Sequence, residues 1–359
     1  MNLPVGIGAA ADYERLAADR LAAPLHAYLA GGSGDDLTVR GNREAFGRWR
    51  LLPRMLSSQG APRCACRLGG QTHAAPILLA PVALQRLVHD RGERETADGA
   101  DTVETGMICS TLSSLPIEVI ARGARVGLRW FQLYLQPERA DTLALLRRAE
   151  AAGCAAIVLT IDATIQLPSR RAQQSGFVMP SDLRSAHHPD HQSVSNNPRL
   201  ADLLARVPGL DDLDWLLNQT RLPVYVKGVL DADEARRIAH AGVAGIVVSN
   251  HGGRTIDGVA ASLDCVAAIR AAVGKQCEVL MDGGVRSGQD VFKAIALGAN
   301  AVLIGRLQIY ALAVAGALGV AHMLRLLREE LEITMAVTGC ANLSDINAAC
   351  LVAVRGALA

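Results

Sequence analysis

The amino-acid sequence predicts an α/β fold of the (β/α)8 TIM-barrel class, with an N-terminal helical cap and a long lid loop after the fourth strand. Eight short apolar runs alternate with helix-like segments along the chain. The runs are apolar at successive positions, as parallel strands covered by helices on both faces are. No G-x-G-x-x-G follows the first run, which argues against an open dinucleotide-binding sheet.

The strands are expected in a regular order, each ending in a turn that leads towards a helix. Between them, segments 141–153 and 231–242 have helical character, and the second begins with an acidic turn and ends at a glycine. Eight such alternations close a barrel. The predicted strands are 76–83, 106–111, 128–134, 155–162, 223–229, 244–250, 278–284 and 300–306.

The whole chain, 1–359, is expected to form a single domain. Residues 1–75 are assigned to the cap, 76–310 to the barrel, 163–220 to the lid loop and 311–359 to C-terminal helices. Loops as long as this lid are usually functional or disordered. The lid contains His187, His188 and His191, which could suggest a metal site, but a mobile polar lid explains them as well. No metal site is therefore predicted.

Composition limits the classes of function. The net charge of +1 argues against binding nucleic acid or an anionic membrane, because both need a basic surplus. The eight cysteines are scattered, and the close pair Cys64 and Cys66 gives a poor zinc signal without a second pair. The first twenty residues lack a basic flank followed by an apolar stretch. The apolar segment 307–324 contains Gln308, Tyr310 and His322 and is interpreted as a buried helix. A cytoplasmic protein is expected.

Polar side chains follow nearly every predicted strand, at the barrel rim where active sites lie. This convergence predicts an enzyme. The glycines and arginines after the last two strands favour a phosphate site, because glycine lets backbone N–H groups approach an anion; the alternative is a pair of tight turns. Lys227 lies in an apolar strand and needs an anionic partner, either a reduced flavin ring or a buried carboxylate.

Several stretches together resemble the FMN-dependent α-hydroxy-acid oxidase and dehydrogenase family, which includes glycolate oxidase, lactate oxidase, mandelate dehydrogenase and hydroxymandelate oxidase. The resemblance covers nearly the whole chain, and the strand-six and strand-seven motifs are the most specific. The stretches are AYLAGGSGDD (27–36), LAPVALQ (79–85), RWFQLY (129–134), PVYVKGV (223–229), SNHGGRTIDG (249–258), MDGGVRSGQDVFKAIALGANAVLIGR (281–306) and ELEITMAVTGC (330–340).

The resemblance implies oxidation of an (S)-2-hydroxy acid to the 2-oxo acid, and a role for individual residues. His251 matches the catalytic base, Asp162 the carboxylate that orients it, and Arg254 the anchor for the substrate carboxylate. Tyr28 and Tyr134 match tyrosines that contact substrate, and Lys227 matches a lysine beside the flavin. The implied FMN contacts are Pro81, Val82, Ala83, Ser113, Gln132, Thr160, Lys227, Ser249, Asp282, Gly283, Gly284, Arg286, Gly305 and Arg306.

The spacing of His251 and Arg254 suits this chemistry. A base and a carboxylate anchor must stand a few ångströms apart, because the substrate carboxylate is bonded to the carbon that is oxidised. A strand end fixes the histidine, and Gly252 and Gly253 let the chain turn so that the arginine faces the same pocket. An imidazole can accept a proton near neutral pH, and a guanidinium can bind a carboxylate bidentately.

Two departures from the family pattern concern the substrate. An ungapped count places Ser169 where the family has an arginine on the lid side of the pocket, although a slip of one residue would bring Arg170 there. Leu115 occupies the place of a tryptophan of glycolate oxidase, which favours a more open pocket and a mandelate-like substrate.

The resemblance leaves the electron acceptor open between O2 and a quinone or carrier protein, with a soluble oxidase favoured. It also implies a homotetramer or octamer. The alternatives are a flavin-binding protein of the same family that has lost turnover, and another FMN barrel enzyme such as an isomerase, which would leave His251 and Arg254 unexplained.

Overall fold

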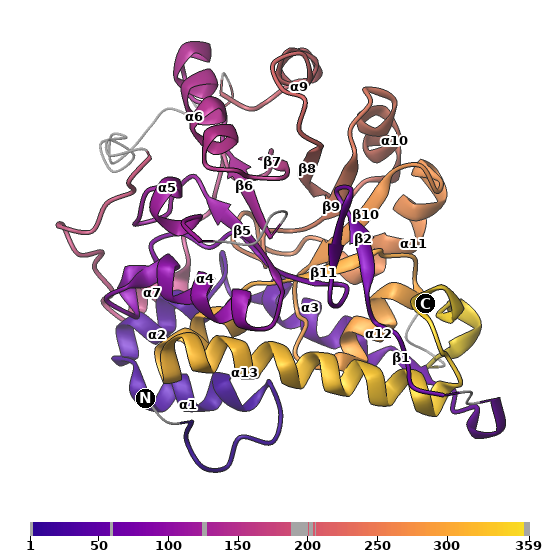
Figure 1. Ribbon diagram of the computed structural model, residues 1–359. Helices are drawn as coiled ribbons and strands as arrows, with labels where there is room; N and C mark the ends of the chain where they lie inside the picture. Colours follow the sequence, from indigo (N-terminus) through magenta and orange to yellow (C-terminus); the bar gives the residue numbers. More distant parts are fainter. Residues whose placement is uncertain are drawn as a thin grey trace.

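A closed barrel of parallel strands forms the centre of the molecule, which confirms the predicted fold class (Figure 1). The computed structural model describes residues 3–57, 60–123, 128–187, 200, 204 and 206–354. The barrel closes where β11 pairs with β4, with Val302 opposite Ile77. Each strand lies within the range predicted for it. The strands are β4 (Ile77–Leu79), β5 (Gly106–Ser110), β6 (Arg129–Leu133), β7 (Ile157–Thr160), β8 (Val224–Val229), β9 (Gly245–Val248), β10 (Glu278–Asp282) and β11 (Ala301–Ile304).

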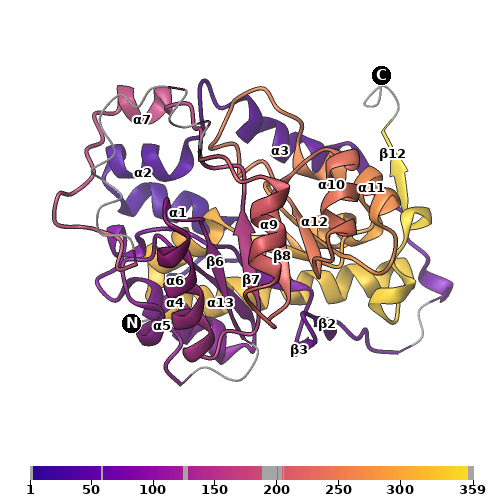
Figure 2. The same ribbon diagram turned by 90° about the horizontal axis from the view of Figure 1, so that it is seen from above.

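Helices surround the barrel, as the alternation predicts (Figure 2). The two helices predicted by range correspond to α6, which begins and ends slightly earlier than expected, and to α10, which lies within its predicted range. Asp231 starts α10 by accepting a hydrogen bond from the backbone N–H of Glu234 at 2.7 Å, as an N-cap residue does. The surrounding helices are α4 (Gly92–Thr102), α5 (Ile117–Ile120), α6 (Arg139–Ala151), α9 (Leu210–Leu217), α10 (Ala232–His240), α11 (Ser262–Val273), α12 (Gly288–Ala296) and α13 (Arg306–Thr338).

The segment before the barrel contains helices, as expected, but also short strands that the sequence analysis does not predict. The helices are α1 (Asp12–Arg20), α2 (Ala23–Ala30) and α3 (Leu37–Gly47). β1 (Trp49–Leu51) pairs with β12 (Leu351–Ala353) and joins the segment before the barrel to the C-terminal segment. The short 3-10 helices are η1 (Met55–Ser57), η2 (Gln85–Leu87), η4 (Leu343–Asp345) and η5 (Ala348–Cys350).

A hairpin of β2 (Cys66–Leu68) and β3 (Gln71–His73) packs against the interior of the barrel. Leu68 belongs to a buried cluster with Trp130 and Tyr225, which lie near the beginnings of β6 and β8. The hairpin therefore covers the amino-terminal end of the barrel and leaves the carboxyl end for a site.

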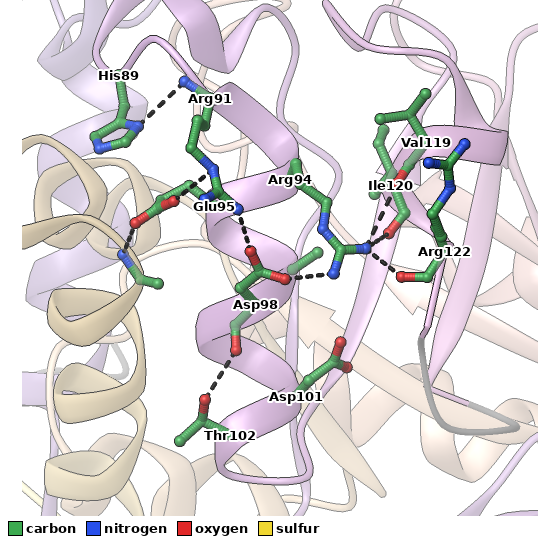
Figure 3. Close-up of polar contacts among 12 residues, drawn as sticks. His89, Arg91, Arg94, Glu95, Asp98, Asp101, Thr102, Val119, Ile120 and Arg122 are labelled. Atoms are coloured by element: carbon green, nitrogen blue, oxygen red, sulfur yellow. Dashed lines mark hydrogen bonds and ion pairs between the residues drawn. The ribbon is translucent and has the colours of Figure 1, made fainter.

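Helix α13 is longer than expected and crosses the boundary predicted between the barrel and the C-terminal helices. Its backbone breaks at Ala315 and at Gly316, whose φ is 57°. Glu95 of α4 accepts a hydrogen bond from the N–H of Ala317 at 2.9 Å, so a carboxylate caps the resumed helix (Figure 3). The helix is long and apolar enough to span a membrane, but 78% of its most apolar window is buried inside the protein, as in a core helix.

The described part of the lid region contains short helices. It contains α7 (Arg170–Gln174) and α9, while His188 and His191 lie outside the described residues. His187 is buried, and its Nε2 accepts a hydrogen bond from the N–H of Ile117 at 2.8 Å. Among the residues that the structure describes, no group of three or more His, Cys, Asp or Glu is suited to hold a metal. His187 is thus a packing residue of the lid.

Candidate active site

A cavity of about 250 Å³ opens at the carboxyl ends of the barrel strands. Residues from the N-terminal cap, from the strand ends and from the lid all contribute to its wall, so segments far apart in sequence meet there. The predicted site residues that line it are Tyr28, Pro81, Val82, Ala83, Gln132, Tyr134, Thr160, Lys227, His251, Arg254, Asp282, Gly283, Gly284, Arg286, Gly305 and Arg306.

His251 follows β9 in a turn of left-handed residues. Its φ is 56°, and those of Gly252 and Gly253 are 62° and 76°. A non-glycine residue with positive φ is uncommon and often marks a functional site. The turn brings Nδ1 of His251 to 2.9 Å from Oδ1 of Asp162. Because a carboxylate can only accept, Nδ1 carries a proton, and in the neutral ring Nε2 keeps its lone pair.

Asp162 can reach the histidine because the neighbouring strand has no side chain in its way. A Cβ at Gly228 would lie 2.6 Å from the Cβ of Asp162, and Gly228 sits at a register irregularity in β8 with φ of 107°. Burial acts to raise the pKa of Asp162, but His251 and Lys227 outweigh it, so the pKa lies below its usual range. Asp162 is therefore ionised at neutral pH and can stabilise an imidazolium.

Arg254 faces the same cavity. Its Nη1 donates to the carbonyls of Tyr28 and Gly31, each at 3.1 Å, and its Cζ lies 5.0 Å from the centre of the Tyr28 ring. On its other side the Tyr28 ring stacks on Phe177 of the lid, at a centroid distance of 4.3 Å. These contacts fix the guanidinium beside His251, where it can bind an anion bidentately.

Lys227 is buried in β8 and pairs with Asp282 of β10, Nζ to Oδ2 at 3.4 Å. This is the buried-carboxylate alternative that the sequence analysis leaves open. Both side chains also line the cavity, and Oδ1 of Asp282 has no hydrogen-bond partner among the described residues. The pair leaves the ammonium at the wall of the cavity, where it can also face a ligand.

Glycine backbone contributes to one end of the cavity. Gly283 and Gly284 have φ values of 101° and 85°, and a Cβ at Gly284 would collide with the carbonyl of Asn42 in α3. Gly305 precedes the first residue of α13 and offers no side-chain cap. Glycine-rich loops and a helix N-terminus are features that bind phosphate groups.

Two arginines stand at this glycine-rich end. Arg286 pairs with Glu14 of α1, Nε to Oε2 at 2.8 Å. The guanidinium of Arg306 donates to the carbonyls of Leu29, Gly31 and Gly252. Burial, and then the nearby Arg254, lower the pKa of Arg306 to about 10. The guanidiniums of Arg306 and Arg254 repel each other, and an anion bound between or beside them would relieve this repulsion.

The residues present fit FMN. Nε2 of Gln132 and Oγ1 of Thr160 are buried at the cavity wall and have no hydrogen-bond partner among the described residues. Leaving buried polar groups unpaired is costly, so a polar ligand is needed there. A flavin ring offers such groups, and its phosphate suits the glycines and arginines at the other end.

Some residues proposed from the sequence do not line the cavity: Asp162, which acts through His251, and Ser113, Ser249 and Leu115. The Ser113 hydroxyl donates to the carbonyl of Ser110 at 2.8 Å, and Ser110 lines the cavity instead. The Ser249 hydroxyl accepts from the N–H of His251 at 3.0 Å and so supports the turn. Leu115 packs against the apolar core and does not line the cavity, so the more open pocket and the mandelate-like substrate expected from this position stay predictions.

The lid places no arginine in the cavity wall among the residues that the structure describes. Ser169 caps α7 by accepting from the N–H of Ala172 at 3.3 Å. Arg170 turns outward to Asp35 at 3.1 Å, and Arg171 lies 3.6 Å from Asp36. Within the part of the chain that the structure describes, Gln166 is the polar lid residue that lines the cavity.

Other lining residues are not predicted from the sequence. Most are apolar and carry no chemical signal, while the sequence marks Gly252 only as a turn residue and Tyr310 only as part of a buried helix. They are Leu29, Ala80, Leu87, Ser110, Leu112, Gln166, Gly252, Ile309 and Tyr310.

The barrel and its cavity define a class of protein: a barrel enzyme that holds a phosphorylated cofactor beside a base and a carboxylate anchor. Comparison with known proteins gives the family. The protein family described as "FMN-dependent dehydrogenase" matches residues 17–353 of the chain. The chain therefore belongs to the FMN-dependent 2-hydroxy-acid oxidase family, and it is an FMN enzyme.

Relatives and solved structures support this assignment along nearly the whole chain. An L-lactate oxidase of Alicycliphilus denitrificans is 54% identical over 352 residues, 96% of each protein. A 4-hydroxymandelate oxidase of Amycolatopsis orientalis is 43% identical, covering 92% of this chain and 94% of the relative. The crystal structure of mandelate oxidase with (S)-4-hydroxymandelic acid matches with a TM-score of 0.88 at 40% identity, covering 96% of this chain and 98% of that one.

Proposed function

We propose that the protein oxidises an (S)-2-hydroxy acid to the corresponding 2-oxo acid and passes the electrons to O2. The observation that carries this proposal is the arrangement of His251, held by Asp162 at 2.9 Å, beside Arg254 in one cavity. A base and a guanidinium on the same side of a cofactor site are what oxidation of such a substrate requires.

The chain's own residues have distinct tasks in this reaction. Arg254 binds the substrate carboxylate, and its contact with the Tyr28 ring at 5.0 Å fixes its orientation. Nε2 of His251 accepts the proton that the substrate releases, and Asp162 stabilises the imidazolium that results. The hydroxyl of Tyr134 contacts the substrate; burial raises the pKa of this tyrosine, so it remains a hydrogen-bond donor.

FMN, when bound, accepts the two electrons that leave the substrate carbon. Gln132 and Thr160 would pair with its ring, since their buried polar atoms lack partners among the described residues. Lys227, already at the cavity wall, would stabilise negative charge on the reduced ring. The glycine-rich end with Arg286 and Arg306 would hold the phosphate.

We propose a short aliphatic substrate such as L-lactate. The L-lactate oxidase that is 54% identical supports this choice. The mandelate-like substrate expected from the sequence stays the alternative, and the 4-hydroxymandelate oxidase that is 43% identical supports it. Because no lid cation lines the cavity among the described residues, the carboxylate is held mainly by Arg254, and we expect a KM higher than that of family members with an inward-facing lid arginine.

A second candidate is a flavin-binding protein with little turnover. The exposed pair of Arg170 with Asp35, the pairing of Arg171 with Asp36 and the capping role of Ser169 favour it, because none of these lid residues lines the cavity. The two candidates differ in one measurable respect, the reduction of bound FMN by a 2-hydroxy acid.

Anaerobic titration tests the proposal. L-lactate, glycolate and (S)-mandelate are added separately to the FMN-loaded protein while the flavin absorbance is recorded, and air is then admitted. We expect L-lactate to bleach the flavin fastest and air to restore it rapidly. Bound FMN that none of the acids bleaches would establish the second candidate. Slow reoxidation in air, made rapid by a quinone, would identify a dehydrogenase.

The assembly and the location of the protein remain predictions. We propose a homotetramer or octamer in the cytoplasm, by analogy with the family that the sequence resembles. Sedimentation velocity of the FMN-loaded protein measures the assembly directly, and a monomer at micromolar concentration would contradict it.

A further inference from the structure

Tyr310 has a buried hydroxyl that the proposed reaction does not use. The side chain is fully buried and lines the cavity, yet the hydroxyl has no hydrogen-bond partner among the described residues. The nearby ring of His26, 6.1 Å away between centroids, makes no hydrogen bond with it within the described chain. A buried hydroxyl in this situation is costly unless a ligand completes it.

The position of Tyr310 relates it to one end of the cavity. It lies four residues after Arg306 in the first turns of α13, so the two side chains share a helix face. The N-terminus of this 33-residue helix begins at the cavity wall, directly after Gly305. The partial positive charge of a helix N-terminus favours a phosphate.

Charged groups, mostly cations, lie around the hydroxyl. Burial, the largest influence, raises the pKa of Tyr310; Arg306, Arg286 and Arg171 act to lower it, and Glu14 acts to raise it. The phenol therefore keeps its proton at neutral pH and serves as a donor. The unpartnered atoms of Gln132 and Thr160, by contrast, come from β6 and β7, on strands remote from α13 in the barrel order. The Tyr310 hydroxyl thus suits one part of a ligand, and the polar atoms of Gln132 and Thr160 suit another part of the same ligand.

We propose that Tyr310 is a further FMN ligand, whose hydroxyl donates a hydrogen bond to the FMN phosphate beside Arg306. This inference rests on FMN binding and extends the proposed function by a residue that the sequence analysis assigns to the core alone. It concerns the cofactor only, so it stands whichever 2-hydroxy acid is the substrate.

The variant Tyr310→Phe removes one oxygen and keeps the ring that lines the cavity. The protein is stripped of flavin, and the dissociation constants of FMN and of riboflavin are measured by quenching of flavin fluorescence. We expect FMN to bind about tenfold more weakly than to the parent protein, since a hydrogen bond to a charged group contributes a factor of this order. Riboflavin, which lacks the phosphate, is expected to bind within about twofold of the parent.

A matched control is Tyr13→Phe. Tyr13 is also buried, but its hydroxyl lies 3.0 Å from Nδ1 of His322, away from the cavity lining. We expect it to leave both dissociation constants unchanged. The melting temperature of each flavin-free variant reports folding: Tyr310→Phe loses only an unpaired hydroxyl and should melt no lower than the parent.

Two outcomes would overturn the proposal. An unchanged FMN dissociation constant in Tyr310→Phe would show that the hydroxyl does not meet the phosphate. Equal weakening of FMN and riboflavin would show that Tyr310 acts on the ring or on the shape of the cavity. Failure of any 2-hydroxy acid to bleach the flavin would contradict the proposed reaction but leave this phosphate contact intact.

Discussion

His251 combines an unusual backbone conformation with a fixed side chain. Its φ of 56° is tolerated by few residue types, and Asp162 holds its ring from one side. Asparagine adopts this conformation more readily than most residues. A variant with asparagine therefore removes the base while preserving the turn that places Arg254.

We predict that His251→Asn binds FMN like the parent protein but is bleached by L-lactate at least about a hundredfold more slowly, because a positioned general base contributes 10²–10⁴ in rate. Anaerobic stopped-flow absorbance measures both properties. His240→Gln, a change at an exposed histidine of α10, is the control. Equal bleaching rates in His251→Asn and the parent would remove His251 from the mechanism.

Glu93 ties together two loops that line the cavity. It is fully buried, and its carboxylate accepts from the N–H of Gln85 at 3.0 Å and from the N–H and hydroxyl of Ser114 at 2.8 and 2.6 Å. The loop after β4 and the loop after β5 are joined in this way. Removing the carboxylate would leave buried donors unpaired.

We predict that Glu93→Ala lowers the free energy of unfolding by about 3 kcal/mol or more, because each unpaired buried donor costs about 1–3 kcal/mol. Urea unfolding of the FMN-loaded protein measures it. Glu329→Ala, which breaks an exposed ion pair with Arg325, should change stability by at most about 1 kcal/mol. A loss as small as that of the control would show that the Glu93 bonds contribute little.

At the residue scale, catalytic and ligand-binding side chains are easier to predict from the sequence than side chains that only line the cavity. Two of the predicted residues, His251 and Arg254, follow an apolar run, and Lys227 lies within one. Charged or titratable residues at such positions have few roles other than binding or catalysis. Ser113 cannot be separated from Ser110 by sequence, because the turn after β5 decides which hydroxyl faces the cavity. Tyr310 carries no signal of a ligand contact, because its helix is apolar on most faces.

At the scale of elements, α13 depends on a single glycine where its axis breaks. Gly316 has φ of 57°, and an added Cβ would lie 2.7 Å from Oε1 of Glu95, the group that caps the resumed helix. Figure 3 shows Glu95 between this cap and Arg91, which in turn contacts Asp98. Only glycine fits this junction of α4 and α13 without strain.

We predict that Gly316→Ala destabilises the protein by about 1–3 kcal/mol through backbone strain and displacement of Glu95. Gly41→Ala is the matched control, for which the opposite effect on stability is expected. Gly41 lies within α3 without a positive φ, and the space that an added methyl group would occupy is open, so alanine there should stabilise by about 0.5–1 kcal/mol. Thermal unfolding of both variants measures the difference, and equal effects of the two changes would contradict the account of the kink.

His187 is one of the lid residues that attach the lid to the loop after β5. Its Nδ1 lies 3.3 Å from the carbonyl of Thr111, and its Nε2 accepts from Ile117, so only the neutral ring satisfies both contacts. Burial, and then the charge of Arg148, lower the pKa of His187 to about 4, while Glu118 acts in the opposite direction. The unfolded chain binds this proton near pH ~6.5. The stabilisation is therefore complete above about pH 6.5 and is lost as the pH falls towards 4.

We predict that the parent protein loses about 2 kcal/mol of unfolding free energy through this histidine between about pH 7 and pH 5. His187→Gln should be less stable at neutral pH but show a correspondingly smaller fall between the two values, measured by urea unfolding. His240→Gln should follow the pH dependence of the parent. A pH dependence of His187→Gln that matches the parent's would place the titration elsewhere.

The elements themselves are predictable to different extents. Apolar runs in the sequence mark all the barrel strands, because strands buried on both faces leave a continuous apolar signal. The hairpin β2–β3 has three residues in each strand, too few for a pattern to emerge. The extent of α13 is not predictable because the sequence does not show that two helices continue across the break at Gly316.

At the scale of the whole molecule, the N-terminal cap and the barrel complete one site. The carboxylate of Asp257, in the turn that carries His251, accepts from the N–H groups of Asp35 and Thr38 at 2.9 and 2.8 Å. These bonds begin α3 and hold the cap over the loop after β9. The cap then supplies Tyr28 and backbone carbonyls that accept hydrogen bonds from Arg254 and Arg306. Neither the cap nor the barrel therefore forms the cavity alone.

The charges around the cavity are not balanced by the protein itself. Lys227, Arg254, Arg286 and Arg306 line it, whereas Asp282 is the carboxylate in the described lining, with Asp162 and Glu14 as outer partners. Four cations in a partly buried cavity repel one another, and a phosphate dianion relieves that repulsion. FMN is thus expected to stabilise the folded protein as well as to carry electrons.

We predict that removing FMN lowers the melting temperature, and that restoring it at about a hundredfold excess over its dissociation constant returns about 2.7 kcal/mol, or roughly 4 °C. Riboflavin at the same multiple of its own dissociation constant should raise the melting temperature by the same amount. At the same concentration as FMN, riboflavin should raise it less, because it lacks the phosphate that the cations bind. Raising the salt concentration should weaken the effect of FMN more than that of riboflavin, since only the charged ligand gains from the cation cluster. Scanning calorimetry measures these shifts, and a salt response identical for the two flavins would mean that the arginines at the glycine-rich end are satisfied by Glu14 and the backbone carbonyls alone.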